Sequence, residues 1–258
     1  MPREDPKQIQ INNMNSKILT LVLVIFVITP ALNAAILLTE PFNATGTMPL
    51  TGWTSISGTG SHISITSSNG LEMGTSDRDY DRQFTAQSGD VFYGFDLSVP
   101  VGLPSGSEYF TGFGDGTGFD SRVFITKETG DNFSLGLSIG GSSAATSTSA
   151  FSLGSSYYRV VVRYNATTDS TALWIGTYSE LAPSISITGT DASTSTNEIF
   201  LRQADEYDNL ASPIWYVRNL TVATSFAEVA PIPEPSTYVL IGLGLAGLIA
   251  LRRFKRAA

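Results

Sequence analysis

Acidic side chains are the strongest candidates for chemistry in this chain of 258 residues. Asp115 and Asp120 flank two glycines, while Asp205, Glu206 and Asp208 fall in a polar segment. Carboxylate oxygens on loops are the ligands that calcium prefers. We therefore place the candidate metal site at Asp115, Asp120, Asp205 and Asp208, with calcium as the favoured ion and no cofactor required. The alternative is a solvated acidic surface without a bound ion.

A third acidic group alternates with basic and aromatic residues at Asp77, Asp79 and Asp81. Its spacing begins like an EF-hand calcium loop. Arg82 and Gln83 follow where such a loop needs glycine, so the pattern is not an EF-hand.

Composition removes most other enzyme chemistry. The chain has no cysteine, which excludes disulfides, thiolate nucleophiles and cysteine-bound zinc, and its single histidine, His62, cannot form a multi-histidine metal site. A Gly-x-Ser-x-Gly pattern centred on Ser138 matches the nucleophile turn of serine hydrolases. Alternating apolar residues surround Ser138, whereas that turn needs a strand followed by a helix, so we reject this chemistry.

Alternating apolar residues predict the elements that must position these side chains. Every second residue from 91 to 99 is large and apolar, which predicts a strand with one buried face. Residues 158–164 alternate in the same way, and 165–169 are typical of a turn before a strand at 171–175. These two strands should form a hairpin.

Further strands are predicted at 62–66, 109–113, 122–126, 133–139, 198–203 and 214–222. About ten strands with Gly and Ser turns predict an all-β fold, a jelly-roll sandwich of two antiparallel sheets at residues 36–230. No amphipathic helix is predicted between 36 and 231. The Ser-, Ala- and Thr-rich stretch 140–149 should be a mobile loop. Residues 36–231 carry 20 acidic and 8 basic side chains, which disfavours nucleic acid as a partner.

The first 35 residues have the pattern of a secretory signal peptide. An apolar run at 18–29 follows Lys17 and precedes small residues up to Ala35. As a helix the run spans about 18 Å, too short for a hydrocarbon core of about 30 Å. We therefore expect export by the Sec machinery and cleavage by signal peptidase, with Met14 as an alternative start.

Three parts follow one another at the C-terminus. Residues 231–237 form a Pro-rich linker, 238–251 are uncharged and predict a transmembrane helix, and 252–258 form a basic tail. The positive-inside rule places this tail at the cytoplasmic face. Its basic residues are Arg252, Arg253, Lys255 and Arg256.

This order resembles the C-terminal sorting signal of PEP-CTERM proteins, which are exported through Gram-negative inner membranes. The matching residues are Pro233, Glu234 and Pro235, the apolar run 238–251 and the Arg-rich end. The resemblance implies a single-pass membrane precursor that an exosortase processes at Glu234 and its flanking prolines. It also implies a location at the cell envelope, the cell surface or the extracellular matrix. A plain tail anchor is the alternative.

The later strands resemble those of concanavalin A-like, or laminin G-like, sandwich domains. The resemblance covers about residues 38–228 and lies in 158–164, 173–175, 199–203 and 219–222. It implies a fold rather than an activity. Arg218 stands where relatives often carry an acidic residue, which weakens any role transferred to this strand.

A polysaccharide hydrolase on this fold needs two carboxylates that face each other at roughly 5–10 Å. The Glu-x-Asp-x-x-Glu strand motif of sandwich glucanases is absent, because Ala211 stands where the last glutamate after Glu206 and Asp208 belongs. Carbohydrate binding needs only aromatic platforms and polar groups. The candidate platforms are Trp53, Tyr80, Tyr109, Trp174, Trp215 and Tyr216, and burial in the core is the alternative for each.

We therefore expect a noncatalytic exported surface or extracellular-matrix protein with a candidate polysaccharide-binding sandwich. The alternative is a polysaccharide-active enzyme, a hydrolase or a lyase, on the same fold. Two carboxylates converging in a concave groove beside exposed aromatic rings would favour the enzyme, whereas a closed groove covered with hydroxyl groups would favour a structural role.

Substitution of Glu234 should leave the precursor at full length, because the resemblance makes this residue part of the recognition site. Immunoblots of whole cells report the ratio of precursor to processed protein. Glu228→Gln, upstream of the matching residues, is the control. Processing of E234A at the wild-type rate would contradict the assignment.

Overall fold

The computed structural model describes residues 34–74, 78–100, 102–103, 106–140, 146–177, 179–190, 193–203 and 215–230. The predicted linker, membrane helix and basic tail lie outside these residues, as do nearly all of the predicted signal peptide and Asp77, Asp205, Glu206 and Asp208. Within the described ranges, no helix is long and apolar enough to cross a membrane.

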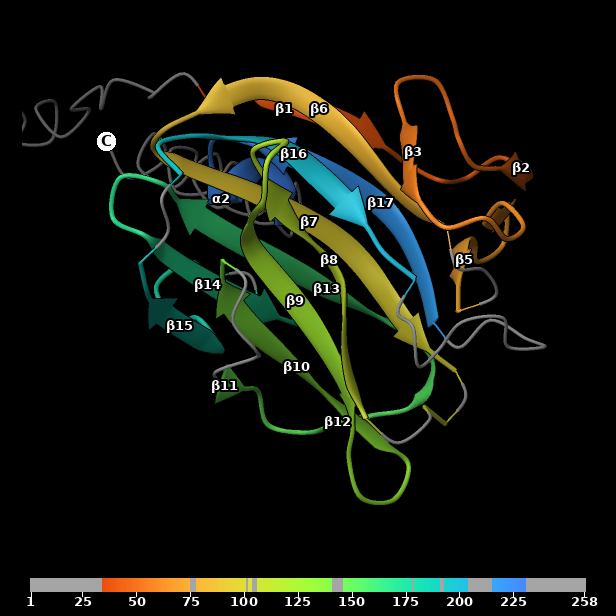
Figure 1. Cartoon of the computed structure of the whole chain (residues 1–258). Helices are drawn as coiled ribbons and strands as arrows, with labels where there is room; N and C mark the ends of the chain where they lie inside the picture. Colours follow the sequence, from red (N-terminus) through yellow and green to blue (C-terminus); the bar gives the residue numbers. More distant parts are fainter. Residues whose placement is uncertain are drawn as a thin grey trace, which may run out of the picture. The chain divides into compact units, whose positions relative to one another are not determined.

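Two sheets, A and B, form the sandwich (Figure 1). The strands of sheet A are β1 (Ile36–Glu40), β2 (Gly46–Thr47), β4 (Ser64–Thr66), β5 (Gly70–Met73), β7 (Asp90–Val99), β13 (Gly154–Asn165), β14 (Ser170–Ile175), β15 (Ile185–Thr188) and β17 (Trp215–Ala223). The strands of sheet B are β3 (Thr54–Ser57), β6 (Asp79–Gln87), β8 (Ser107–Gly114), β9 (Phe119–Lys127), β10 (Asn132–Ile139), β11 (Thr146–Ser147), β12 (Phe151–Ser152) and β16 (Thr196–Leu201).

The strand order in sheet A is β15-β14-β13-β7-β17-β5-β4-β2, with β1 beside β17. In sheet B the order is β11-β10-β9-β8-β16-β6-β3, with β12 beside β10. Neighbouring strands run antiparallel, as in β13 against β7 and β16 against β8. The predicted antiparallel jelly-roll sandwich is confirmed.

The core lies between the two sheets and is centred on β7. The alternating residues that predicted this strand are fully buried, and they are Val91, Tyr93, Phe95, Leu97 and Val99. Tyr93 meets Phe113 of β8 edge to face with ring centroids 4.7 Å apart, and Phe95 meets Phe110 at 5.9 Å. A fully buried side chain of this size contributes about 1.5–3 kcal/mol. These contacts therefore fix β8 against β7.

The predicted hairpin is also confirmed. Strands β13 and β14 pair from Val160 with Ile175 to Asn165 with Ser170. The Asn165 side-chain oxygen accepts the amide protons of Thr167 and Thr168, a local bond that is typical of turns.

A short helix, α2 (Phe226–Val229), covers part of the outer face of sheet A. It packs with Phe92, Val161 and Trp174 in a second apolar cluster. Phe92 is therefore buried although it lies on the face of β7 opposite the predicted apolar face. The expectation of no helix between 36 and 231 missed α2. A single turn of four residues is too short to show a helical period.

Several strands escaped prediction because they are short or polar. The described residues contain seventeen strand segments rather than about ten. Strand β6 is the most important of them, since its alternating charges at Asp79 and Asp81 gave the pattern of an acidic cluster. In the stretch expected to be a mobile loop, residues 146–147 instead pair with β10.

Position 112 requires glycine, because the backbone of β9 and the ring of Phe200 approach it closely. A Cβ atom there would lie 2.0 Å from the carbonyl oxygen of Ser121 and 2.7 Å from the ring of Phe200. We predict that Gly112→Ala destabilises the fold by about 3 kcal/mol, at the upper end of overpacking costs. Thermal unfolding should then occur about 6–12 °C lower.

Gly89→Ala is the matched control, because a Cβ atom at Gly89 would meet nothing within 4 Å. Equal melting temperatures for G112A and G89A would contradict the packing that places Phe200 over Gly112.

Candidate functional site

The outer face of sheet B gathers carboxylates and aromatic rings from neighbouring strands. Asp81 on β6 lies opposite Phe200 on β16, which lies opposite Gly112 on β8, which lies opposite Arg122 on β9. Because Ile199 and Leu201 point into the core, their neighbours on β16 point outward. We call this surface the acid–aromatic face, formed by Asp79, Asp81, Tyr109, Phe119, Arg122, Phe124, Glu198, Phe200 and Arg202.

Asp81 and Glu198 form a hydrogen-bonded pair of carboxyl groups on this face. Burial, the charge of Asp81 and the hydrogen bond with Asp81 together raise the pKa of Glu198 to about 7, and burial is the largest of these causes. Burial also raises the pKa of Asp81, although the hydrogen bond with Glu198 opposes that shift. When two close carboxyl groups share one proton, the hydrogen bond between them raises the pKa of the donor, Glu198, and lowers that of the acceptor, Asp81. Near neutral pH, Glu198 donates this proton to Asp81.

Glycines border Glu198 on the side of β8. A Cβ atom at Gly114 would lie 3.3 Å from Glu198 Oε1, and one at Gly116 would lie 3.8 Å from Oε2. Neither position carries a side chain that could cover the carboxyl group. The glycines therefore leave room beside the one carboxyl of the pair that titrates near neutral pH.

Asp115 shapes the turn between β8 and β9. Its Oδ1 accepts hydrogen bonds from the amide of Thr117 at 2.8 Å, the hydroxyl of Thr117 at 2.7 Å and the amide of Gly118 at 2.9 Å. Its Oδ2 accepts one from Ser193 at 2.8 Å. Burial acts to raise the pKa of Asp115, but these hydrogen bonds outweigh it and the pKa is lowered.

The predicted metal ligands are brought together only in part. Asp115 and Asp120 both lie near enough to Glu198 to raise its pKa, and the Asp120 side chain is buried. Within the described ranges, no three His, Asp or Glu side chains are grouped so that they could hold a metal ion. Asp205 and Asp208 lie outside the described residues. Calcium binding therefore stays a prediction.

Four aromatic rings pack beside the carboxyl pair. Tyr109 lies 5.4 Å from Phe119, 5.7 Å from Phe124 and 6.2 Å from Phe200, measured between ring centroids. The guanidinium of Arg122 lies 4.7 Å from the Tyr109 centroid, and that of Arg202 lies 4.2 Å from it. Cation–π contacts of this kind hold a ring in one orientation. The rings are thus held in place before any ligand arrives.

Arg202 joins this aromatic cluster to the acidic residues. Its Nε lies 3.6 Å from Asp79 Oδ2, and its Nη1 lies 3.8 Å from Glu108 Oε2. The face therefore combines apolar rings with paired charges of both signs.

Most of the predicted aromatic platforms belong to the interior. Trp53, Tyr80, Trp174 and Trp215 are buried, so for them the alternative of a core residue is right. Tyr109 lies on the acid–aromatic face and is half-buried, and Tyr216 is half-buried on sheet A.

Sequence reasoning missed Phe119 and Glu198. Phe119 is 37% exposed, and it is the one aromatic residue among the exposed large hydrophobic side chains of the described chain. The alternation in the sequence indicated that Glu198 points outward from its strand. Its partner Asp81, more than a hundred residues away, was not.

Ser138 lies near the end of β10, in the strand that its alternating neighbours predicted. Its side chain is fully buried. Its hydroxyl accepts a hydrogen bond from Arg122 Nε at 3.3 Å. His62 lies before β4, in the other sheet, and contacts the hydroxyl of Tyr80 at 2.6 Å. The structure places these two residues in separate environments.

Comparison with protein families finds the PEP-CTERM protein-sorting motif at residues 231–256. The chain carries a PEP-CTERM sorting signal. The matched PEP-CTERM residues include Pro233, Glu234, Pro235 and Arg252 to Arg256. This signal marks an exported protein with a C-terminal membrane-anchoring segment that an exosortase processes. The role of each matched residue in recognition by the exosortase stays a prediction.

Comparison with curated proteins finds no match. Among solved structures, the endo-1,3-β-glucanase from Streptomyces sioyaensis is similar with a TM-score of 0.47 and 10% identity over 75% of this chain and 98% of that chain. The carbohydrate recognition domain of Emp47p is similar with a TM-score of 0.46 and 6% identity over 74% of this chain and 95% of that chain. A SAP-like pentraxin from Limulus polyphemus is similar with a TM-score of 0.40 and 14% identity over 57% of this chain and 70% of that chain.

The carboxyl pair predicts a pH-dependent stability. The folded-state pKa of Glu198 is about 7, above its ordinary value of 4.5, so the folded state binds more protons than the unfolded state between these values. The stabilising contribution of protonated Glu198 is present below about pH 4.5 and is lost as pH rises through 7. Glu198→Gln stays neutral and should flatten the fall of melting temperature between about pH 5 and 8.

Glu180→Gln, at an exposed position in the turn between β14 and β15, is the control and should leave the pH profile as in the wild type. A constant difference in melting temperature between E198Q and the wild type at every pH would contradict the shared proton.

Proposed function

We propose that the protein is an exported surface or extracellular-matrix protein whose sandwich binds polysaccharide through the acid–aromatic face without cleaving it. The observation that carries this proposal is the fixed group of Phe119 and Tyr109 beside Arg122, Arg202 and Glu198. The PEP-CTERM signal, together with Sec export and cleavage by signal peptidase, would bring this face to the cell envelope or beyond it.

The chemistry of the face suits a sugar ring. The apolar side of a pyranose packs on an aromatic ring, and its hydroxyl groups need donors and acceptors around the edge of that ring. Phe119 supplies exposed ring surface, and the carboxyl group of Glu198 and the hydroxyl of Tyr109 supply polar atoms. Because neighbouring rings hold Tyr109 in place, little side-chain freedom is lost on binding.

The carboxyl pair supports binding rather than hydrolysis. A hydrogen bond between two carboxyl groups brings their oxygens to about 2.5–3.0 Å. Retaining glycosidases hold their carboxyl groups about 5–5.5 Å apart and inverting enzymes hold them farther apart. Because Asp81 and Glu198 share a hydrogen bond, we infer that they do not flank a glycosidic bond in the usual way.

A polysaccharide-active enzyme is the second candidate, and one observation favours it. A carboxyl group with a pKa of about 7 retains its proton near neutral pH, which is what a general acid requires. Glu198 would be that acid.

Phe119→Ala should weaken polysaccharide binding about 10-fold, because stacking on one ring contributes about 0.5–1.5 kcal/mol beyond its buried area. A glycan array of the purified protein, followed by titration of the best glycan with and without calcium, measures the effect. The control is Leu181→Ala, which removes an apolar side chain that is 94% exposed elsewhere. A higher affinity with calcium would support the predicted metal site.

Equal binding by F119A and the wild type would exclude this face as the binding site. Release of oligosaccharides that stops in E198Q but continues in E180Q would instead establish the enzyme.

A further inference from the structure

The last described residues of the chain are seated on the outer face of sheet A. Phe226 meets Trp174 with ring centroids 5.1 Å apart and meets Phe92 edge to face at 6.2 Å. Val229 and Ala230 are buried, while Ala227 and Glu228 between them and Phe226 are exposed. The segment therefore lies on the sheet with one side covered and one side in solvent.

Arg159 holds the end of this segment. Its Nε donates to the carbonyl oxygen of Val229 at 2.8 Å, and its Nη2 donates to the same oxygen. Gly94 makes room for this contact, because a Cβ atom there would lie 2.6 Å from the Val229 oxygen and 2.7 Å from Arg159 Nη2. A glycine, a guanidinium and a backbone carbonyl thus form one close-fitting contact.

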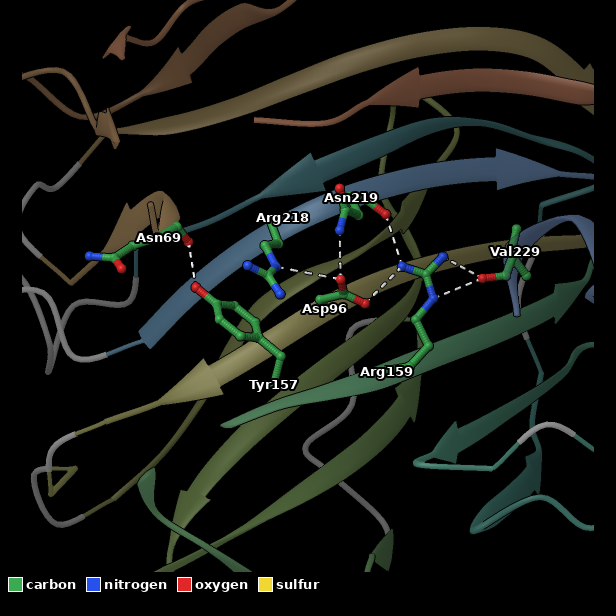
Figure 2. Close-up of polar contacts among 7 residues, drawn as sticks. All are labelled: Asn69, Asp96, Tyr157, Arg159, Arg218, Asn219 and Val229. Atoms are coloured by element: carbon green, nitrogen blue, oxygen red, sulfur yellow. Dashed lines mark hydrogen bonds and ion pairs between the residues drawn. The ribbon is translucent and has the colours of Figure 1, made fainter. Parts of the chain in front are cut away.

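The guanidinium is held in turn by polar groups of two neighbouring strands (Figure 2). Arg159 Nη1 donates to Asp96 Oδ1 at 3.2 Å and to the carbonyl oxygen of Asn219 at 2.9 Å. Asp96 Oδ2 accepts a hydrogen bond from the Asn219 side chain at 2.7 Å and lies 3.6 Å from Arg218 Nε. Burial lowers the pKa of Arg159, and Asp96 opposes that shift, so the guanidinium stays charged.

We call the contact of Gly94, Asp96 and Arg159 with Val229 the C-terminal clasp. It lies two residues before Pro231, where the matched sorting motif begins. From Ala230 to Glu234 the chain can reach at most about 14 Å, at about 3.6 Å per residue. If residues 224–230 left the sheet, the chain would be free from the end of β17 at Ala223, and the maximum reach to Glu234 would be about 40 Å.

We propose that the C-terminal clasp limits access of the exosortase to the Pro-Glu-Pro triplet by holding that triplet close to the folded sandwich. A domain of about 195 residues has a radius of gyration of roughly 16 Å, so the maximum reach of about 14 Å from Ala230 is shorter than that radius. The processing enzyme must then act between this surface and the membrane-anchoring segment. Release of residues 224–230 removes that constraint. The proposal rests on the sorting signal and is independent of polysaccharide binding.

The clasp itself is tested with a single introduced thiol, since the chain has no native cysteine. Val229→Cys keeps the backbone carbonyl and should react slowly with a maleimide in the full-length protein. Adding Arg159→Ala should speed the labelling about 10- to 100-fold, the factor expected for loss of charge-assisted hydrogen bonds. Ala227→Cys is exposed and should react equally fast with and without R159A.

The consequence for processing is tested in cells that contain the exosortase. Arg159→Ala should raise the rate of conversion of precursor several-fold in a pulse-chase experiment. An insertion of seven Gly and Ser residues between Ala230 and Pro231 should do the same with the clasp intact. Arg163→Ala is the matched control, because Arg163 lies on the same strand and contacts Asp90 rather than Val229.

Faster processing of both variants, with R163A unchanged, would support the proposal. Wild-type rates for the insertion variant would overturn it, whatever R159A does, since that variant lengthens the tether without altering the domain. Unchanged labelling of V229C in the R159A background would also overturn it, because Arg159 would then not hold the segment.

Discussion

Strand β7 is buried on both of its faces, and the other elements take their positions from it. On the inner face, Tyr93 and Phe95 pack against Phe113 and Phe110 and so fix β8. On the outer face, Phe92 lies under α2 while Gly94 and Asp96 receive the guanidinium of Arg159. One strand therefore positions sheet B on one side and the C-terminal segment on the other.

The acid–aromatic face is a consequence of that placement. Because β8 is fixed from within the core, its outward positions near β16 are also fixed, and two of them are glycines. Gly112 admits the ring of Phe200 and Gly114 borders the carboxyl group of Glu198. Burial raises the pKa of both Asp81 and Glu198, and the charge of Asp81 raises that of Glu198 further. The positions of the polar groups on the acid–aromatic face thus depend on core contacts made on the other side of sheet B.

The strands that bury one regular face were predictable, and the sites were predictable only in part. β7 and the hairpin of β13 and β14 followed from strict alternation, because the face of a strand that packs against the core needs an apolar residue at every second position. β6 was missed since its outward side carries Asp79 and Asp81 and its inward side mixes Tyr80 with Arg82. α2 was missed because one helical turn contains no period.

The sequence by itself determined the sorting signal, the all-β class and the exclusion of cysteine and multi-histidine chemistry, because each depends on residue types or on spacing along the chain. Only the tertiary structure decided that Asp81 meets Glu198 and that Arg159 meets Val229. Those partners are separated by 117 and by 70 residues in the chain, and they become neighbours through the order in which strands pair. Alternation specifies which face of a strand is buried, but it contains no information about which strand lies beside it.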